Sequence, residues 1–173
     1  SKEILSRLGE NGRLFGFDQD VDAQANAIDD ARFVLIGENF RYIKRFLRFH
    51  GVKKVDGILA DLGVSSHQFD MPERGFSTRF EADLDMRMNQ QSEVTAQVIL
   101  NQYEESEIRR ILKEYGELSN AAILASTVVK ARENEVIQST DQLKKVWAKF
   151  LPAHKTHKIL AQIFQALRIE VNQ

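Results

Sequence analysis

Two kinds of hydrophobic pattern divide the 173-residue chain near residue 92. Before that point, short apolar runs alternate with stretches in which apolar residues recur every three or four positions. The first kind of pattern predicts strands and the second predicts helices. The predicted strands are residues 13–17, 32–36 and 55–62, and the predicted helices are residues 1–8, 20–30 and 40–50. Strands that alternate with helices indicate a parallel sheet, so this part of the chain predicts an α/β fold.

After residue 92 the apolar positions have helical spacing throughout, and no strand pattern interrupts them. The predicted helices are residues 94–101, 104–115, 119–132, 140–151 and 156–172. Ser92, Ser119 and Thr140 are candidate N-caps. This region predicts a helical subdomain that is inserted in the α/β core or appended to it. The predicted parts are a partial core at 1–91, an inserted helical subdomain at 92–160 and a return helix to the core at 161–173.

Both ends of the chain have helical spacing. Residues 1–8 have no strand before them, and residues 163–171 end without a capping residue. We therefore expect an internal fragment, or a chain whose neighbouring segments are disordered or removed.

The composition indicates a globular protein with no membrane partner. Hydrophobic residues make up 43% of the chain, and no apolar run approaches the roughly 20 residues that cross a bilayer. Cys is absent, which excludes disulfides and thiolate metal sites and fits a reducing cytoplasm. His154 and His157 lie three residues apart, but no third ligand lies nearby, so we expect no metal site.

The net charge of −1 conceals three blocks of charge. Residues 39–55 hold six Lys or Arg, and residues 142–169 hold five Lys, one Arg and two His, both without an acid. Residues 56–93 hold eight acids and three Arg. Basic surfaces suit a polyanion such as RNA, although a solvated helix face is the common alternative. The interleaved aromatic residues favour nucleic acid slightly, but we expect them to be core residues; they are Phe49, Trp147 and Phe150.

The densest candidate chemistry follows the apolar run at 55–62. The run ends on Asp61, breaks at Gly63 and leads into a loop rich in Asp, Glu, Arg, Ser and aromatic residues. Ligands of open α/β sheets bind beyond the carboxyl ends of the strands. A buried carboxylate also needs polar partners. Asp61 could cap its own turn, but its proximity to Ser65, Ser66 and Gln68 favours a substrate or cofactor role.

Two further positions follow the first two predicted strands. Asp18 comes after strand 13–17, where a carboxylate can accept both hydroxyls of a ribose. Alternatively, Asp18 or Asp20 caps the next helix. Phe40 could pack on a purine, although a hydrophobic contact at the start of its helix is the commoner outcome.

The string DGILADLGVSSHQFDMPERGFS…LDMRM at 56–88 closely resembles the bacterial 16S ribosomal RNA cytidine N4-methyltransferases, the RsmH or MraW family. FDQD at 17–20, ENFRYI at 38–43 and FQALRIEVN at 164–172 also occur in the family's order. The resemblance implies S-adenosylmethionine (SAM) as cofactor and a doubly wound, Rossmann-like α/β core, here incomplete at both ends, with an inserted all-helical subdomain. The implied substrate is a cytidine in the decoding region of the assembled small subunit.

The same resemblance implies roles for single residues. Asp18 would hold the ribose of the cofactor, Phe40 would lie against its adenine, and Asp61 and Gln68 would line the site near the reacting methyl group. The family's Gly-Gly-His-Ser loop would come just before the first helix, with Ser1 as its last residue. His67 stands where most members have Pro.

The exocyclic N4 is a poor nucleophile, because its lone pair is delocalised into the cytosine ring. Positioning supplies about 7–11 kcal/mol at best. An acceptor on the amino hydrogens would stabilise the positive charge that develops, and Asp61 has the right chemistry, although it could serve the cofactor alone. The base must leave its stack, and Phe69 or Phe76 could provide a stacking surface.

Candidate RNA contacts divide into two groups. Arg74, Arg79 and Arg87 could guide the RNA backbone or pair with neighbouring acids, and we favour internal pairing for Arg87. The helical region offers a platform at 144–158 with the lysines Lys144, Lys145, Lys149 and Lys155.

Two other functions stay open. A nicotinamide-dependent oxidoreductase would share the α/β pattern, and an RNA-binding module without catalysis would explain the basic blocks. The sequence also leaves a homodimer open.

Overall fold

The computed structural model describes residues 1–25 and 27–172, which form two compact units. The sheet unit comprises Ser1–Leu62 and Met88–Gln90, and the helical unit comprises Gly63–Arg87 and the residues from Gln91 onward. Asn26, inside the predicted helix 20–30, and Gln173, at the end of the predicted segment 161–173, lie outside the described residues.

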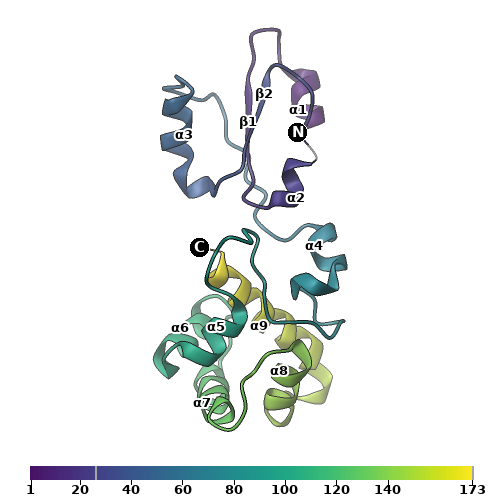
Figure 1. Cartoon of the computed structure of the whole chain (residues 1–173), viewed down its shortest axis with the longest axis vertical. Coiled ribbons are helices and arrows are strands. Elements are labelled where there is room, and N and C mark those ends of the chain that lie inside the picture. The colour runs from purple at the N-terminus through teal and green to yellow at the C-terminus, as the bar shows by residue number, and fades with distance from the viewer. Residues whose placement is uncertain (26, 173) are drawn as a thin grey trace. The chain divides into compact units, whose positions relative to one another are not determined.

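The sheet unit is built on two parallel strands. β1 (Leu14–Phe17) pairs with β2 (Phe33–Ile36), and the register places Leu14 opposite Phe33 and Phe17 opposite Ile36. Its helical segments are α1 (Lys2–Arg7), α2 (Val21–Gln24), the 3-10 turn η1 (Phe40–Tyr42) and α3 (Ile43–Phe49). Figure 1 shows α3 on one side of the strand pair and α1 and α2 on the other. The parallel sheet, its first two strands and the helix at 40–50 are confirmed.

The helix predicted at 20–30 is much shorter in the structure: α2 comprises only Val21–Gln24. The Asp30 carboxylate instead accepts from the backbone N–H of Arg32 at 2.8 Å and pairs with the Arg32 guanidinium at 2.7 Å. Asp side chains compete with a helix in this way by bonding nearby backbone groups. The hydrogen bonds from Arg32 lower the pKa of Asp30 to about 2. Arg32 also donates to the Leu8 carbonyl at 3.1 Å, which fixes the start of β2 beside the end of α1.

The predicted third strand at 55–62 is wrong. This segment has no regular secondary structure, and Ile58, Leu59 and Leu62 are 73%, 81% and 69% exposed. A strand forms only where a neighbour accepts its backbone hydrogen bonds, and within the described ranges β1 and β2 pair only with each other. A hydrophobic pattern indicates that a segment favours the strand conformation, but it does not indicate whether a neighbouring strand is present to pair with it.

The helical unit begins with α4 (Ser66–Asp70) and the 3-10 turn η2 (Pro72–Arg74). The remaining elements are α5 (Ala96–Gln102), α6 (Glu105–Glu114), α7 (Ala121–Arg132), α8 (Thr140–Trp147), η3 (Ala148–Phe150), η4 (Ala153–Lys155) and α9 (Thr156–Val171). The five helices predicted after residue 92 are confirmed. Residues 63–87 group with these helices, and α9 packs against α5 and α6. The three-part division at 91 and 160 stays a prediction.

The predicted N-caps are each displaced. Thr95 caps α5, Asn120 precedes α7 and Ser139 caps α8, in place of Ser92, Ser119 and Thr140. Helices α5 and α8 start where a side chain accepts from the N–H three residues on, as the Ser139 hydroxyl does from Gln142 at 3.2 Å. The Thr140 hydroxyl instead donates to the Phe80 carbonyl at 2.8 Å.

Trp147 lies at the centre of the helical core. Its side chain is fully buried, and its indole N–H donates to the Leu124 carbonyl of α7 at 3.0 Å. The other large, fully buried side chains include Ile99, Leu100, Ile108, Ile111, Leu112, Leu143, Ile163 and Leu167. Trp147 is therefore a core residue as predicted. The same prediction is wrong for Phe49 and Phe150, which are 83% and 40% exposed.

Among the helices of the described ranges, none has both the length and the apolar character needed to cross a membrane.

Trp147→Phe should lower the free energy of unfolding by about 2–4 kcal/mol, because it removes volume from the core and the indole hydrogen bond to the Leu124 carbonyl. Urea denaturation followed by far-ultraviolet circular dichroism measures the change. The control Phe150→Leu, at a half-exposed position, should change stability by less than about 0.5 kcal/mol. Equal stability of the two variants would contradict the role of Trp147.

Gly75→Ala should destabilise the helical unit by about 2–3 kcal/mol. Gly75 has φ +69°, and an added Cβ would overlap the Asp83 carbonyl. Gly63→Ala is the matched control, because a Cβ at Gly63 meets nothing within 4 Å. Thermal unfolding of both variants checks the prediction, and a Gly75→Ala protein as stable as the control would refute it.

Candidate functional site

The carboxyl ends of β1 and β2 lie at the same edge of the sheet, because the strands are parallel. Asp18 is the first residue beyond β1, and its backbone N–H donates to the Ile36 carbonyl at 3.1 Å. The ladder therefore holds the Asp18 backbone beside the end of β2. Its side chain is exposed, and one carboxylate oxygen accepts from the Asp20 N–H at 3.0 Å.

Asp20 is the residue that caps α2. It is only 3% exposed, and its carboxylate accepts from the Asp22 N–H at 3.1 Å. The sequence left open which of the two acids caps the helix. The structure assigns the cap to Asp20, which leaves Asp18 as the exposed carboxylate at the edge.

A pair of amide side chains joins the two loops at this edge. The Asn39 side-chain amide donates to the Gln19 side-chain oxygen at 3.3 Å, while the Asn39 oxygen caps η1 by accepting from the Arg41 N–H at 2.9 Å. Phe40 follows directly and is 56% exposed. Sequence reasoning missed Gln19 and Asn39. The available signal was their similar position, since Gln19 lies two residues after β1 and Asn39 lies three residues after β2.

Asp61 lies elsewhere in the sheet unit, in the exposed segment that was predicted to be a strand. The premise that Asp61 is a buried carboxylate at a strand end is therefore wrong, for the reason given above for residues 55–62. Its catalytic role stays a prediction that depends on the family resemblance.

Gln68 belongs to the helical unit, where it starts α4. It is 6% exposed and forms a capping box with Ser65: the Gln68 side-chain oxygen accepts from the Ser65 N–H at 3.0 Å, and the Ser65 hydroxyl accepts from the Gln68 N–H at 3.2 Å. The structure thus gives Gln68 a local structural task. Its predicted cofactor contact stays a prediction.

The two candidate stacking residues differ in accessibility. Phe69 is 37% exposed, whereas Phe76 is 4% exposed with the Arg74 guanidinium 5.7 Å from its ring centre. A buried ring cannot receive a nucleobase, so Phe69 is the better candidate.

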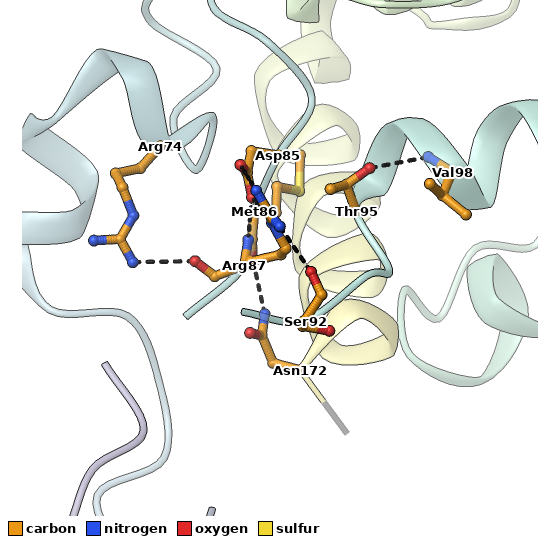
Figure 2. Close-up of polar contacts among 8 residues, drawn as sticks. All are labelled: Arg74, Asp85, Met86, Arg87, Ser92, Thr95, Val98 and Asn172. Carbon is orange, nitrogen blue, oxygen red and sulfur yellow. Dashed lines mark hydrogen bonds and ion pairs between the residues drawn. The ribbon is translucent and has the colours of Figure 1, made fainter. Parts of the chain in front are cut away.

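Asp85, Met86 and Arg87 of the LDMRM string belong to a polar network in the helical unit (Figure 2). Arg87 binds both carboxylate oxygens of Asp85 at 2.8 Å and donates to the Ser92 carbonyl at 2.7 Å. Arg74 donates to the Arg87 carbonyl at 3.0 Å. The internal pairing predicted for Arg87 is confirmed. Burial alone would raise the pKa of Asp85, but the hydrogen bonds from Arg87 outweigh it and hold this pKa below its usual value.

The backbone of this string is also anchored. Met86 is fully buried with φ +61°, a left-handed conformation that is uncommon for a side chain of this size. The Asn172 side chain donates to the Met86 carbonyl at 2.7 Å, and the Met86 N–H donates to the Arg74 carbonyl at 3.0 Å. The network therefore ties α9 to the segment around residue 86, and it uses Arg74 as a buried structural residue.

The remaining predicted RNA contacts are at the surface. Arg79 pairs with Asp70 at 3.1 Å, and both side chains are exposed. Lys144 pairs with Asp141 at 2.8 Å, a hydrogen bond that lowers the pKa of Asp141. The other three lysines of the platform, Lys145, Lys149 and Lys155, are exposed.

Comparison with known proteins identifies the family. A family model described as the MraW methylase family matches residues 1–173. The chain is 68% identical to the ribosomal RNA small subunit methyltransferase H of Flavobacterium psychrophilum over 173 residues, which are all of this chain and 60% of that protein. It is 66% identical to the protein of the same name from Flavobacterium johnsoniae and 53% identical to that from Bacteroides thetaiotaomicron, and it covers 57% of each.

The chain thus spans 57–60% of the length of these curated relatives. The family match extends over every residue of the chain, including the FDQD, ENFRYI and LDMRM segments described above. The chain belongs to the MraW methylase family.

Proposed function

We propose that the protein containing this chain transfers a methyl group from SAM to the exocyclic N4 of a cytidine in small-subunit ribosomal RNA. The observation that carries the proposal is the family match over the whole chain, together with 68% identity to a relative named for methylation of small-subunit ribosomal RNA. The same match argues against a nicotinamide-dependent oxidoreductase, which gives no reason for the loop at 55–88.

The edge of the sheet offers groups that fit the cofactor. When bound, SAM supplies an electrophilic methyl group on a sulfonium. The exposed Asp18 carboxylate would accept hydrogen bonds from its ribose hydroxyls, and the exposed ring of Phe40 would pack against its adenine. Support comes from the parallel strands and from the bond between Gln19 and Asn39, which hold the loops of Asp18 and Phe40 at one edge.

Asp61 is the proposed acceptor for the amino hydrogens of cytosine. An exposed carboxylate can accept these hydrogens and stabilise the positive charge that develops on N4. Phe69, with its partly exposed ring, is the proposed stacking surface for the extruded base. Gln68 is kept as a proposed residue of the cofactor site.

The wider setting is also proposed from the resemblance. It comprises a doubly wound core with an inserted helical subdomain, an assembled small subunit as the substrate, and the cytoplasm as the compartment. A homodimer stays a sequence-based expectation that sedimentation velocity tests.

Asp61→Asn should lower methyl transfer at least 100-fold, because it removes the negative charge that stabilises the developing positive charge on N4. It should leave thermal stability unchanged, because Asp61 is exposed. The 173 residues are placed in the F. psychrophilum relative in exchange for the matched segment, and transfer of tritiated methyl groups to small subunits is measured. Asp56→Asn, an exposed acid five residues away, is the control and should stay near wild type. Near-normal turnover of Asp61→Asn would remove Asp61 from the mechanism. A chimera without transfer to any cytidine N4 would refute the proposed function and leave an RNA-binding module as the alternative.

Neutralising Lys145, Lys149 and Lys155 to Gln should weaken RNA binding and reduce the slope of log K against log salt by about 2, at roughly 0.7 per lost phosphate contact. The control replaces three exposed cations of the same unit, Arg109, Lys113 and Lys130, by Gln. Lys144→Gln alone should have the smaller effect, since Asp141 already neutralises Lys144. An unchanged slope for the triple variant, measured by fluorescence anisotropy, would exclude the platform.

A further inference from the structure

The segment from η1 to the loop after α3 concentrates exposed positive charge. Its six cations are all exposed, and no acid occurs between Glu38 and Asp56. These cations, which we call the α3 basic surface, are Arg41, Lys44, Arg45, Arg48, Lys53 and Lys54. Figure 1 shows α3 on the opposite side of the strand pair from α1 and α2.

Helix α3 has an apolar side toward the strands and carries its cations on the other side. Phe46 and His50 face the strands: the Phe46 ring lies 6.3 Å from that of Phe17, and the His50 ring lies 5.5 Å from that of Phe15. Within α3, Lys44, Arg45 and Arg48 lie three or four residues apart (44 with 48, 45 with 48), so they share the side away from Phe46 and His50. Packing against the sheet therefore fixes the basic side outward.

No acid of the described residues forms an ion pair with these cations. Elsewhere in the described ranges, Arg32, Arg87, Arg110 and Lys144 each pair with a carboxylate at 2.7–3.0 Å. The ion pairs of the described residues include none of the six. Like charges four residues apart on a helix, such as Lys44 with Arg48 in α3, are destabilising. The arrangement is thus unfavourable for the isolated chain and becomes favourable when a polyanion neutralises it.

Aromatic rings accompany the charge. Phe49 is 83% exposed at the end of α3, and Tyr42 is 46% exposed with the Arg41 guanidinium 5.8 Å from its ring centre. Cations that follow a backbone, combined with exposed rings that accept unpaired bases, are the usual composition of a surface that binds single-stranded nucleic acid.

We propose that the α3 basic surface is a second RNA-binding surface, located in the sheet unit, which contacts backbone phosphates while Phe49 stacks on an unpaired base. This proposal rests on the proposed function, because that function makes RNA the binding partner of the protein. It adds a contact region separate in sequence from the lysines of α8, η3 and η4. Charge complementarity favours RNA, and the exposed aromatic rings favour its single-stranded parts.

The test measures binding of a fluorescein-labelled single-stranded RNA of about 20 nucleotides to the full 173-residue chain by anisotropy, across a series of salt concentrations. Arg45→Gln, Arg48→Gln and Lys53→Gln together should weaken binding on the order of 10-fold or more and reduce the salt slope by about 2. Phe49→Leu should weaken binding on the order of 5-fold or more without changing the slope, because it removes stacking and no charge. The control again replaces Arg109, Lys113 and Lys130 by Gln.

An affinity and slope equal to those of the control would overturn the proposal. Equal losses in both triple variants would also overturn it, since they would show a nonspecific effect of net charge. The same proteins are mixed with vesicles that contain anionic lipid, and binding to vesicles in place of RNA would assign the surface to a membrane.

Failure of the proposed function gives a different result. SAM binding and methyl transfer are measured on separate samples of the chimera. A protein that binds RNA through the α3 basic surface but transfers no methyl group would refute the function and keep this surface. A protein that transfers methyl groups and whose α3 variants bind RNA as the control does would keep the function and refute the surface.

Discussion

The parallel pairing of β1 with β2 is the constraint on which the candidate cofactor site depends. It places the residues after both strands at one edge, and the Asp18 N–H extends the ladder to Ile36 by one bond. The bond between Asn39 and Gln19 then joins the two loops. An antiparallel pair would have separated these loops by the length of the strands. The positions of Asp18 and Phe40 therefore follow from backbone hydrogen bonding, before any ligand is considered.

The helical unit uses charge for a different purpose. Within the LDMRM string, which carries much of the family resemblance, Arg87 binds the Asp85 carboxylate, and Arg74 donates to the Arg87 carbonyl. Asn172, the residue after α9, completes this network by donating to the Met86 carbonyl. A string that looks suited to ligand binding thus has a structural task, which explains why it needs these residue types.

Cations illustrate the same division between structure and binding. Arg32, Arg87 and Lys144 lie close to acids that neutralise them, whereas the cations of the α3 basic surface lie in a segment without acids. Pairing inside the fold removes a cation from the set available to RNA. Counting basic residues in the sequence therefore overestimates the positive charge that some surfaces offer to RNA, such as the platform that contains Lys144. The count also does not show which basic surface offers the most unpaired charge.

The sequence by itself determined the family, the parallel pair of strands, the helix at 40–50 and the five helices after residue 92. Local pattern suffices for these, because the spacing of apolar residues is a property of neighbouring residues. Only the tertiary structure decided that Phe76 is buried, that Phe49 is exposed and that residues 55–62 form no strand. Each of these depends on which distant groups are present to bond or cover a residue, and a one-dimensional pattern does not contain that information.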